Sequence, residues 1–126
     1  MKEIIYSKHA PEPLGPYSQA VKVGDVLYTA GQIPIDPVRN ELVSGGIEEQ
    51  TLQVMKNLEH ILMAADTSFD RVIKATVFLI DLNDFSAFNK IYGTFFDEAS
   101  APVRSTVEVA ALPKGARLEI ELVVGL

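Results

Sequence analysis

The sequence contains no cysteine, no tryptophan and only two histidines among its 126 residues. Without cysteine the chain can form no disulfide, no thiol nucleophile and no thiolate metal site. His9 and His60 are 51 positions apart, so no metal motif such as two histidines on one helical turn is present. We therefore expect neither a bound metal nor a cofactor.

Basic side chains are also scarce, with 11 Lys and Arg against 17 Asp and Glu and a net charge of −6. Non-specific binding of nucleic acid depends mainly on neutralising phosphates, so an acidic chain is not expected to take nucleic acid as its main partner. The apolar runs are too short to span a membrane. The N-terminus has neither a long apolar stretch nor an Arg- and Ser-rich leader. We expect a cytoplasmic protein with no membrane partner.

A chain of 126 residues with 48% hydrophobic and 22% charged residues has ordinary globular composition. This length suits a single domain, residues 1–126, with a core of its own. The mean hydropathy of +0.16 is high for a protein of this charge. Part of the apolar surface is therefore expected to be buried against another subunit.

The first third of the chain reads as short strands and turns. Residues 4–6 predict a strand, and a proline-rich turn region follows. Residues 18–23 and 26–30 flank Gly24-Asp25 and predict a tight hairpin, because glycine supplies the positive φ that such a turn needs. Residues 33–37 contain two prolines and must leave the sheet, since proline cannot donate to a ladder.

The remainder alternates between helical and strand periods. Apolar residues at three- and four-residue steps predict a first helix, with Ile47, Thr51, Val54, Met55, Leu58, Ile61, Leu62 and Ala65 on one face and a solvated His60 on the other. A buried central strand over 72–80 follows. Asn83 or Asp84 can cap a second helix, whose core face carries Phe85, Phe88, Ile91, Tyr92, Phe95 and Phe96. Strands over 103–109 and 117–124 complete an α+β fold with the helices on one face of the sheet.

Alternation divides the last two strands into apolar and charged faces. Arg104, Thr106 and Glu108 lie opposite the valines of their strand, and Glu119 and Glu121 lie opposite the leucines of theirs. If the helices cover the apolar faces, both charged faces point to solvent or to another subunit. For an arbitrary sheet, a solvated face laced with ion pairs is the favoured interpretation. The sharper hypothesis is that Arg104 grips a substrate carboxylate and Glu119 handles a water molecule.

Several motifs in order along nearly the whole chain resemble the RidA/YjgF family. They are Gly15-Pro16-Tyr17-Ser18-Gln19-Ala20, Thr29-Ala30-Gly31-Gln32-Ile33-Pro34, Lys74-Ala75-Thr76-Val77-Phe78, Asp81-Leu82-Asn83-Asp84-Phe85, Asn89-Lys90-Ile91-Tyr92, Pro102-Val103-Arg104-Ser105, Glu108-Val109-Ala110, Leu112-Pro113-Lys114 and Leu118-Glu119-Ile120-Glu121. The resemblance implies a chorismate-mutase-like α+β domain, with two helices packed on one face of a mixed sheet. It also implies a homotrimer with clefts between subunits.

The activity implied by the resemblance is a deaminase, a hydrolase acting on C=N bonds. Its substrates would be the reactive enamines and imines that pyridoxal-phosphate dehydratases release, such as 2-iminobutanoate and 2-iminopropanoate. The products would be 2-oxo acids and ammonia. An imine of this kind is already electrophilic, so the site needs neither a metal nor a covalent nucleophile, only groups that fix the carboxylate, hold water and move protons.

Three catalytic roles carry over from the family by matching positions. Arg104 would bind the substrate carboxylate, Glu119 would activate or hold water, and Tyr17 would hydrogen-bond near the substrate nitrogen. Glu121 is a structural rival to Glu119, and only the family motif favours the first glutamate. Tyr17 has the alternative role of plugging an interface, as buried tyrosines often do.

Three further positions would contact substrate. Gly31 matches a glycine whose backbone approaches the ligand, Asn89 an asparagine that lines the cleft, and Thr106 the residue beside the arginine. Gly31 could instead be required only for its backbone conformation. Asn89 could instead pack the second helix against a neighbour. Thr106 stands where many relatives have cysteine and Ala30 where many have serine, which puts the substrate range in question.

Other functions remain open as alternatives. The same pocket could belong to a non-catalytic module that binds 2-oxo acids, although retaining both Arg104 and Glu119 argues for catalysis. Ribonuclease or translation-inhibitor activity is disfavoured by the acidic charge and the lack of a basic groove. Chorismate mutase is suggested by fold alone, and its two-carboxylate substrate needs more cationic groups than one arginine.

Overall fold

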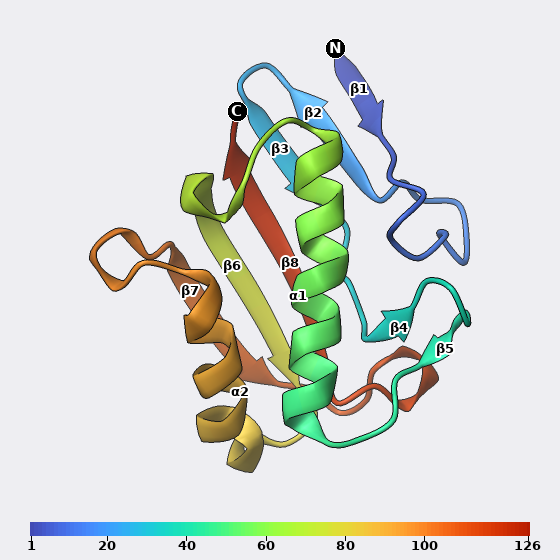
Figure 1. Cartoon of the computed structure of the whole chain (residues 1–126), viewed down its shortest axis with the longest axis vertical. Helices are drawn as coiled ribbons and strands as arrows, with labels where there is room; N and C mark the ends of the chain where they lie inside the picture. The colour runs from blue at the N-terminus through green and yellow to red at the C-terminus, as the bar shows by residue number, and fades with distance from the viewer.

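Six strands form one mixed sheet in a computed structural model that describes all residues, 1–126 (Figure 1). In spatial order they are β1 (Lys2–Ile5), β2 (Ala20–Val23), β3 (Val26–Thr29), β8 (Leu118–Gly125), β6 (Val72–Leu79) and β7 (Val103–Glu108). Only β6 and β7 run parallel, and every other neighbouring pair is antiparallel. The strand predicted over 72–80 is therefore interior, and the two final strands lie on either side of it.

The predicted hairpin is present, with Val23 opposite Val26 and Gly24 at a φ of +58°. The segment after β3 leaves the main sheet, as its prolines require. There β4 (Ile35–Asp36) pairs with β5 (Glu41–Leu42) in a separate two-stranded sheet. Asn57 anchors this segment, because its side-chain amide donates to the Ile35 carbonyl at 2.9 Å.

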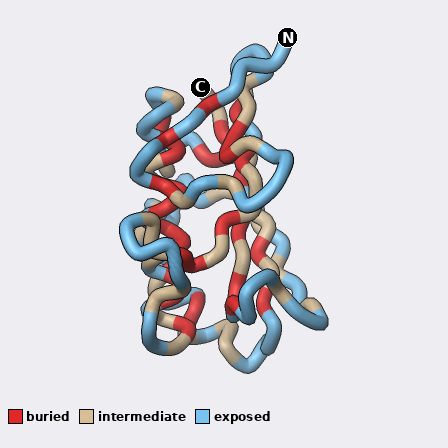
Figure 2. Tube along the Cα trace, turned by 90° about the vertical axis from the view of Figure 1, so that its right-hand side faces the viewer, coloured by how far each residue is buried: buried red, intermediate tan, exposed pale blue.

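Two helices, α1 (Ile47–Ala64) and α2 (Phe85–Tyr92), lie side by side on one face of the sheet (Figure 1). The apolar stripe predicted for α1 is buried as expected, from Ile47 through Leu62. It meets the inward residues of β6 and β8, such as Val77 and Ile120, which are 0% exposed. Figure 2 places the buried segments where the two layers meet. Neither helix has the length and apolar character needed to cross a lipid bilayer.

Two local expectations need correction. The second helix ends at Tyr92, and Phe95 and Phe96 follow in and just after a short 3-10 turn, although both still pack against the core. His60 is half-buried rather than solvated. Its ring lies 5.4 Å from that of His9, centroid to centroid, because the N-terminal turn region folds back onto α1.

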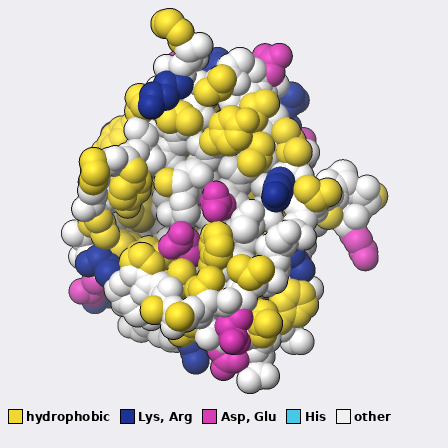
Figure 3. Space-filling view, turned by 180° about the vertical axis from the view of Figure 1, so that it is seen from behind, with side chains coloured by type: hydrophobic (Ala, Val, Ile, Leu, Met, Phe, Trp, Pro, Cys, Tyr) yellow, Lys and Arg dark blue, Asp and Glu magenta, His cyan; other side chains and the backbone are white.

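The other face of the sheet is covered by no element of the chain. Figure 3 looks onto it and shows hydrophobic side chains around a hollow that holds acidic groups. Val103, Val107 and Tyr28 point to this side and are 66%, 44% and 47% exposed. Strand register places Glu119 and Glu121 on the same side, opposite Phe78 and Thr76.

The expected placement of the charged face of β7 is wrong. Arg104 pairs with Ala75, which in turn pairs with Leu122, and both of these are buried beneath the helices. Arg104, Thr106 and Glu108 therefore lie on the helix side, and the valines lie on the open side. Alternation separates the two faces of a strand but does not say which one a helix covers. Here the aromatic side chains of α2 cover the arginine.

Candidate active site

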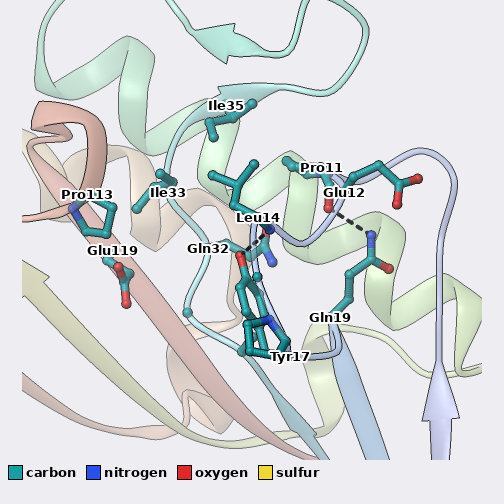
Figure 4. A pocket seen from close by; sticks show the side chains of 14 residues that line it. Pro11, Glu12, Leu14, Tyr17, Gln19, Gln32, Ile33, Ile35, Pro113 and Glu119 are labelled. Carbon is teal, nitrogen blue, oxygen red and sulfur yellow. Dashed lines mark hydrogen bonds between the residues drawn. The ribbon is translucent and has the colours of Figure 1, made fainter.

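Tyr17, Gly31 and Glu119 meet at one open cavity of about 540 Å³. Tyr17 comes from the loop before β2, Gly31 from the segment after β3, and Glu119 from the start of β8 (Figure 4). Gln32 joins the last two segments, because it exchanges both backbone hydrogen bonds with Ile120 at 2.9 and 3.2 Å. The rest of the wall is largely apolar and includes Leu14, Ile33 and Pro113.

The Glu119 side chain lies directly against the Cα of Gly31. A methyl group at position 31 would come within 2.2 Å of Oε2 and 2.7 Å of Cδ of Glu119. Burial raises the pKa of Glu119 above its ordinary value, and the negative charge of Glu121 on the same face of β8 raises it further. A raised pKa makes a carboxylate a stronger base, which favours its uptake of a proton from water.

Hydrogen bonds shape the loop that carries Tyr17. The phenolic oxygen of Tyr17 accepts a hydrogen bond from the Leu14 backbone N–H at 3.2 Å, which leaves its own O–H free to donate (Figure 4). Gln19 is only 2% exposed. Its side chain accepts from the Ser7 N–H and donates to carbonyls of Ser7, Ala10 and Pro11, which ties residues 7–11 to the start of β2.

Arg104 and Asn89 line a second open cavity, of about 580 Å³, between α2 and the edge strand β7. Asn89 Oδ1 accepts a hydrogen bond from Arg104 Nη1 at 2.6 Å. The guanidinium carbon lies 4.9 Å from the centre of the Tyr92 ring, 5.3 Å from Phe85 and 5.7 Å from Phe88. These distances are within the range of cation–π attraction.

Arg104 forms no ion pair in the chain. The salt bridges join Arg39 to Glu41, Lys90 to Glu48, and Arg117 to Asp84. Arg104 is nevertheless half-buried, and a cation removed from water is usually paired with an anion. An unpaired guanidinium beside an open cavity is a site for an external carboxylate or phosphate group.

Thr106 shares the helix side of β7 with Arg104 but lines neither cavity. Its hydroxyl oxygen is covered and has no hydrogen-bond partner. A direct contact from this side chain to substrate therefore stays a prediction without a geometric counterpart. No group of three or more His, Asp or Glu side chains gathers in a way that could hold a metal ion.

Five of the six predicted site residues thus separate into two groups within one chain, and Thr106 belongs to neither. Tyr17, Gly31 and Glu119 share a cavity, while Arg104 and Asn89 line another. Because Glu119 and Arg104 point to opposite faces of the sheet, a small substrate cannot touch both in a single copy. A site that uses both requires a second copy.

The sequence did not predict that one face of α2 holds the Arg104 side chain in place. Phe85, Phe88, Asn89 and Tyr92 follow the i, i+3, i+4, i+7 spacing of one helix face. The sequence predicts the aromatics as core, which is confirmed for Phe88 and Tyr92, and the asparagine as a cleft residue. The polar Asn89 within an aromatic stripe was the available signal that this face receives a polar group.

Comparison with known proteins agrees with this architecture. Residues 7–125 match the model of the endoribonuclease L-PSP family. A RutC family protein of Pyrococcus horikoshii is 52% identical over 98% of this chain and 97% of its own length. The 2-iminobutanoate/2-iminopropanoate deaminase of Mus musculus is 46% identical, over 98% of this chain and 90% of its own.

Among solved structures, YyfA of the conserved Rid protein family from Yersinia pestis superposes with a TM-score of 0.97. It is 47% identical, and the match covers the whole of both chains. The fold, the order of the motifs and the full-length similarity to proteins of this kind lead to one conclusion: the chain belongs to the RidA/YjgF family.

Proposed function

We propose that this protein hydrolyses 2-imino acids, such as 2-iminobutanoate and 2-iminopropanoate, to 2-oxo acids and ammonia. The observation that carries the proposal is the half-buried Arg104 guanidinium, which faces an open cavity and has no carboxylate partner in its own chain. The name of the mouse relative supports the same reaction.

Arg104 binds the substrate carboxylate in this proposal. A guanidinium has five N–H donors, and Asn89 accepts from only one nitrogen. The remaining donors can bind a carboxylate in a bidentate pair, which fixes the position of C2, the carbon of the C=N bond.

Glu119 moves the protons. Water adds to C2 of the protonated imine, and its proton passes to the Glu119 carboxylate. The same proton then goes to the nitrogen of the tetrahedral intermediate. The C–N bond breaks, its electron pair leaves with ammonia, and the hydroxyl proton passes to the Glu119 carboxylate, which has just given up its proton, as the C=O bond forms. The Tyr17 hydroxyl donates a hydrogen bond to the substrate nitrogen or to the water.

The proposed assembly is a homotrimer with the sites at its interfaces. Arg104 of one copy would complete the cavity that contains Tyr17 and Glu119 of the next. The open apolar face of the sheet, with Val103 and Val107 exposed, is suited to burial against another copy. A cytoplasmic location also stays a prediction.

The test generates the imine in place with a threonine dehydratase and traps the unhydrolysed part with semicarbazide. We expect the wild-type protein to speed the loss of trappable imine. Arg104→Ala should reduce this effect at least a hundredfold, because it removes the carboxylate partner. Arg39→Ala, which breaks an exposed surface ion pair, is the matched control and should behave like wild type.

Two further measurements on the same proteins, binding of 2-oxobutanoate and cleavage of RNA, separate the alternative functions. Binding of 2-oxobutanoate without hydrolysis of the imine would show that the protein is a non-catalytic binding module and not a deaminase. The description of the family model suggests RNA as another substrate. RNA cleavage that is lost with Arg104→Ala, together with no effect on the imine, would overturn the deaminase proposal in favour of a nuclease.

A further inference from the structure

One face of α2 joins the hydrophobic core and also contacts Arg104. The side chains at the i, i+3, i+4 and i+7 positions, Phe85, Phe88, Asn89 and Tyr92, all contact its guanidinium. Such a stripe normally packs against an apolar strand. In this chain it packs against a strand whose residue on the helix side is a cation, so the stripe forms a seat for a charged group.

The seat restricts a side chain that is otherwise flexible. An arginine on a strand has several rotatable bonds, and holding its end group in one place costs conformational entropy. Aromatic faces attract the guanidinium without neutralising it, whereas a carboxylate would compete with the substrate. The α2 seat thus orders the cation and leaves its charge available.

Tyr92 makes the closest of the three aromatic contacts, at 4.9 Å. Its ring is fixed between Phe88 and Phe96, at centroid distances of 5.2 and 4.7 Å, and the residue is 6% exposed. Its hydroxyl is covered and has no hydrogen-bond partner. Arg104 also acts on this hydroxyl, because it opposes the rise in the pKa of Tyr92 that burial causes. We assign the contact that positions the guanidinium to the ring face, and Tyr92→Phe separates the ring from the hydroxyl.

We propose that Tyr92 is a positioning residue, whose ring holds the Arg104 guanidinium in the pose that receives the substrate carboxylate. The proposal rests on the deaminase function above for its substrate, but the ordering of the guanidinium is a property of the ligand-free protein. Tyr92 lines the same cavity as Arg104, and its proposed role is exerted through the guanidinium, which the Arg104 Nε–H signal reports directly.

The experiment compares Tyr92→Leu, which removes the aromatic face, with Tyr92→Phe, which keeps it. Phe69→Leu is the matched control, because Phe69 packs against Phe95 and Phe96 and not against Arg104. Three quantities are measured for each variant: KM and kcat for the imine, the dissociation constant of 2-oxobutanoate, and the NMR signal of the Arg104 Nε–H in the ligand-free protein.

We expect Tyr92→Leu to raise KM and the 2-oxobutanoate dissociation constant about tenfold while kcat changes less than twofold. Its Arg104 Nε–H signal should broaden or shift toward that of a free arginine. Tyr92→Phe should match wild type in all three quantities and unfold at the same or a higher temperature, since it removes an unsatisfied hydroxyl. Phe69→Leu should lower the unfolding temperature without changing KM.

Wild-type KM in Tyr92→Leu, or a Tyr92→Phe variant as impaired as Tyr92→Leu, overturns the proposal. Failure of the deaminase function itself gives a different pattern. In that case wild type does not hydrolyse the imine, and the Nε–H signal decides. A signal ordered in wild type and Tyr92→Phe but not in Tyr92→Leu supports the seat, and an equal signal in all three refutes it.

Discussion

At the scale of single residues, Gly31 and Glu119 depend on one another for space. Gly31 does not have a positive φ, so any L-residue could adopt its backbone conformation. What excludes a side chain is the Glu119 carboxylate, whose Oε2 would lie 2.2 Å from an added Cβ. Of the two roles considered for this glycine, backbone conformation is thus not the constraint, and the contact is with a proposed catalytic group.

Gly31→Ala should therefore impair catalysis by displacing the Glu119 side chain. We expect kcat to fall about a hundredfold, which is the contribution typical of one general acid or base, because the carboxylate is displaced from the cavity. Steady-state kinetics on the imine provide the measurement. Gly46→Ala is the control, since its Cβ would meet only the ends of two side chains, Arg117 at 3.4 Å and Glu49 at 3.8 Å, and it should keep kcat. A fully active Gly31→Ala would show that Glu119 need not occupy this position.

Glu121 is the second residue on which Glu119 depends. Its negative charge disfavours ionisation of Glu119 and so adds to the rise in pKa that burial causes. If ionised Glu119 takes the proton from water, activity is lost as pH falls through its pKa. Glu121→Gln removes the like charge and lowers that pKa.

The acid limb of the pH profile of kcat/KM should consequently move to lower pH in Glu121→Gln. It should not reach the position of an ordinary glutamate, because the burial of Glu119 persists. Glu41→Gln, at an exposed ion pair that lines neither cavity, should leave the profile in place. An acid limb that stays put or moves upward in Glu121→Gln would assign it to a different group.

At the scale of elements, two parts of the proposed site, the loop of Tyr17 and the short helix α2, depend on side-chain contacts to hold them in place. The loop carrying Tyr17 is fixed by the side chain of Gln19, which replaces a strand ladder with four hydrogen bonds to residues 7–11. On the other side, α2 has only eight residues, and its aromatic stripe carries both its packing and the seat of Arg104. In both places, side chains outside the reaction hold a proposed catalytic side chain, Tyr17 or Arg104, in position.

Gln19→Leu tests the hydrogen bonds that tie the loop to residues 7–11. It leaves buried backbone groups of residues 7–11 unsatisfied, so we expect a loss of about 2–4 kcal/mol in the free energy of unfolding. KM should rise as well, because Leu14 and Tyr17 line the cavity. Urea titration and steady-state kinetics measure the two effects. Ser68→Ala, which removes one exposed hydrogen bond to Asp70, should change neither by much. Unchanged stability in Gln19→Leu would mean that the loop is held by other contacts.

At the scale of the whole molecule, the open face of the sheet links assembly to activity. The proposed catalytic groups lie on opposite faces of one sheet, so a working site needs two copies even though each copy folds around its own core. Assembly and activity should therefore be lost together.

Val107→Lys is expected to dissociate the assembly and abolish imine hydrolysis while the circular dichroism spectrum stays that of the wild type. Val107 is 44% exposed on the open face, so a lysine is tolerated in the isolated chain but not against an apolar partner surface. Sedimentation equilibrium gives the oligomeric state. Val38→Lys, at a residue 91% exposed and away from the sheet, should remain assembled and active. An active monomer of Val107→Lys would refute shared sites.

Local patterns determined much of this protein. Helical spacing located α1 and α2, the Gly24 turn located the hairpin, and alternation divided β7 and β8 correctly into two faces. These features follow from periods of a few residues, which the chain carries wherever it is placed. The family resemblance added the roles of the site residues, which remain predictions.

Long-range pairing decided the rest. The register of β7 against β6 places Arg104 beneath α2 rather than beside Glu119, and the pairing of Gln32 with Ile120 brings Gly31 to Glu119 across most of the chain. Alternation separates an apolar from a charged face on β7, but only the tertiary packing decides which of the two faces the helices cover. The choice of face separates the proposed catalytic groups, and so makes a second copy necessary for the proposed chemistry.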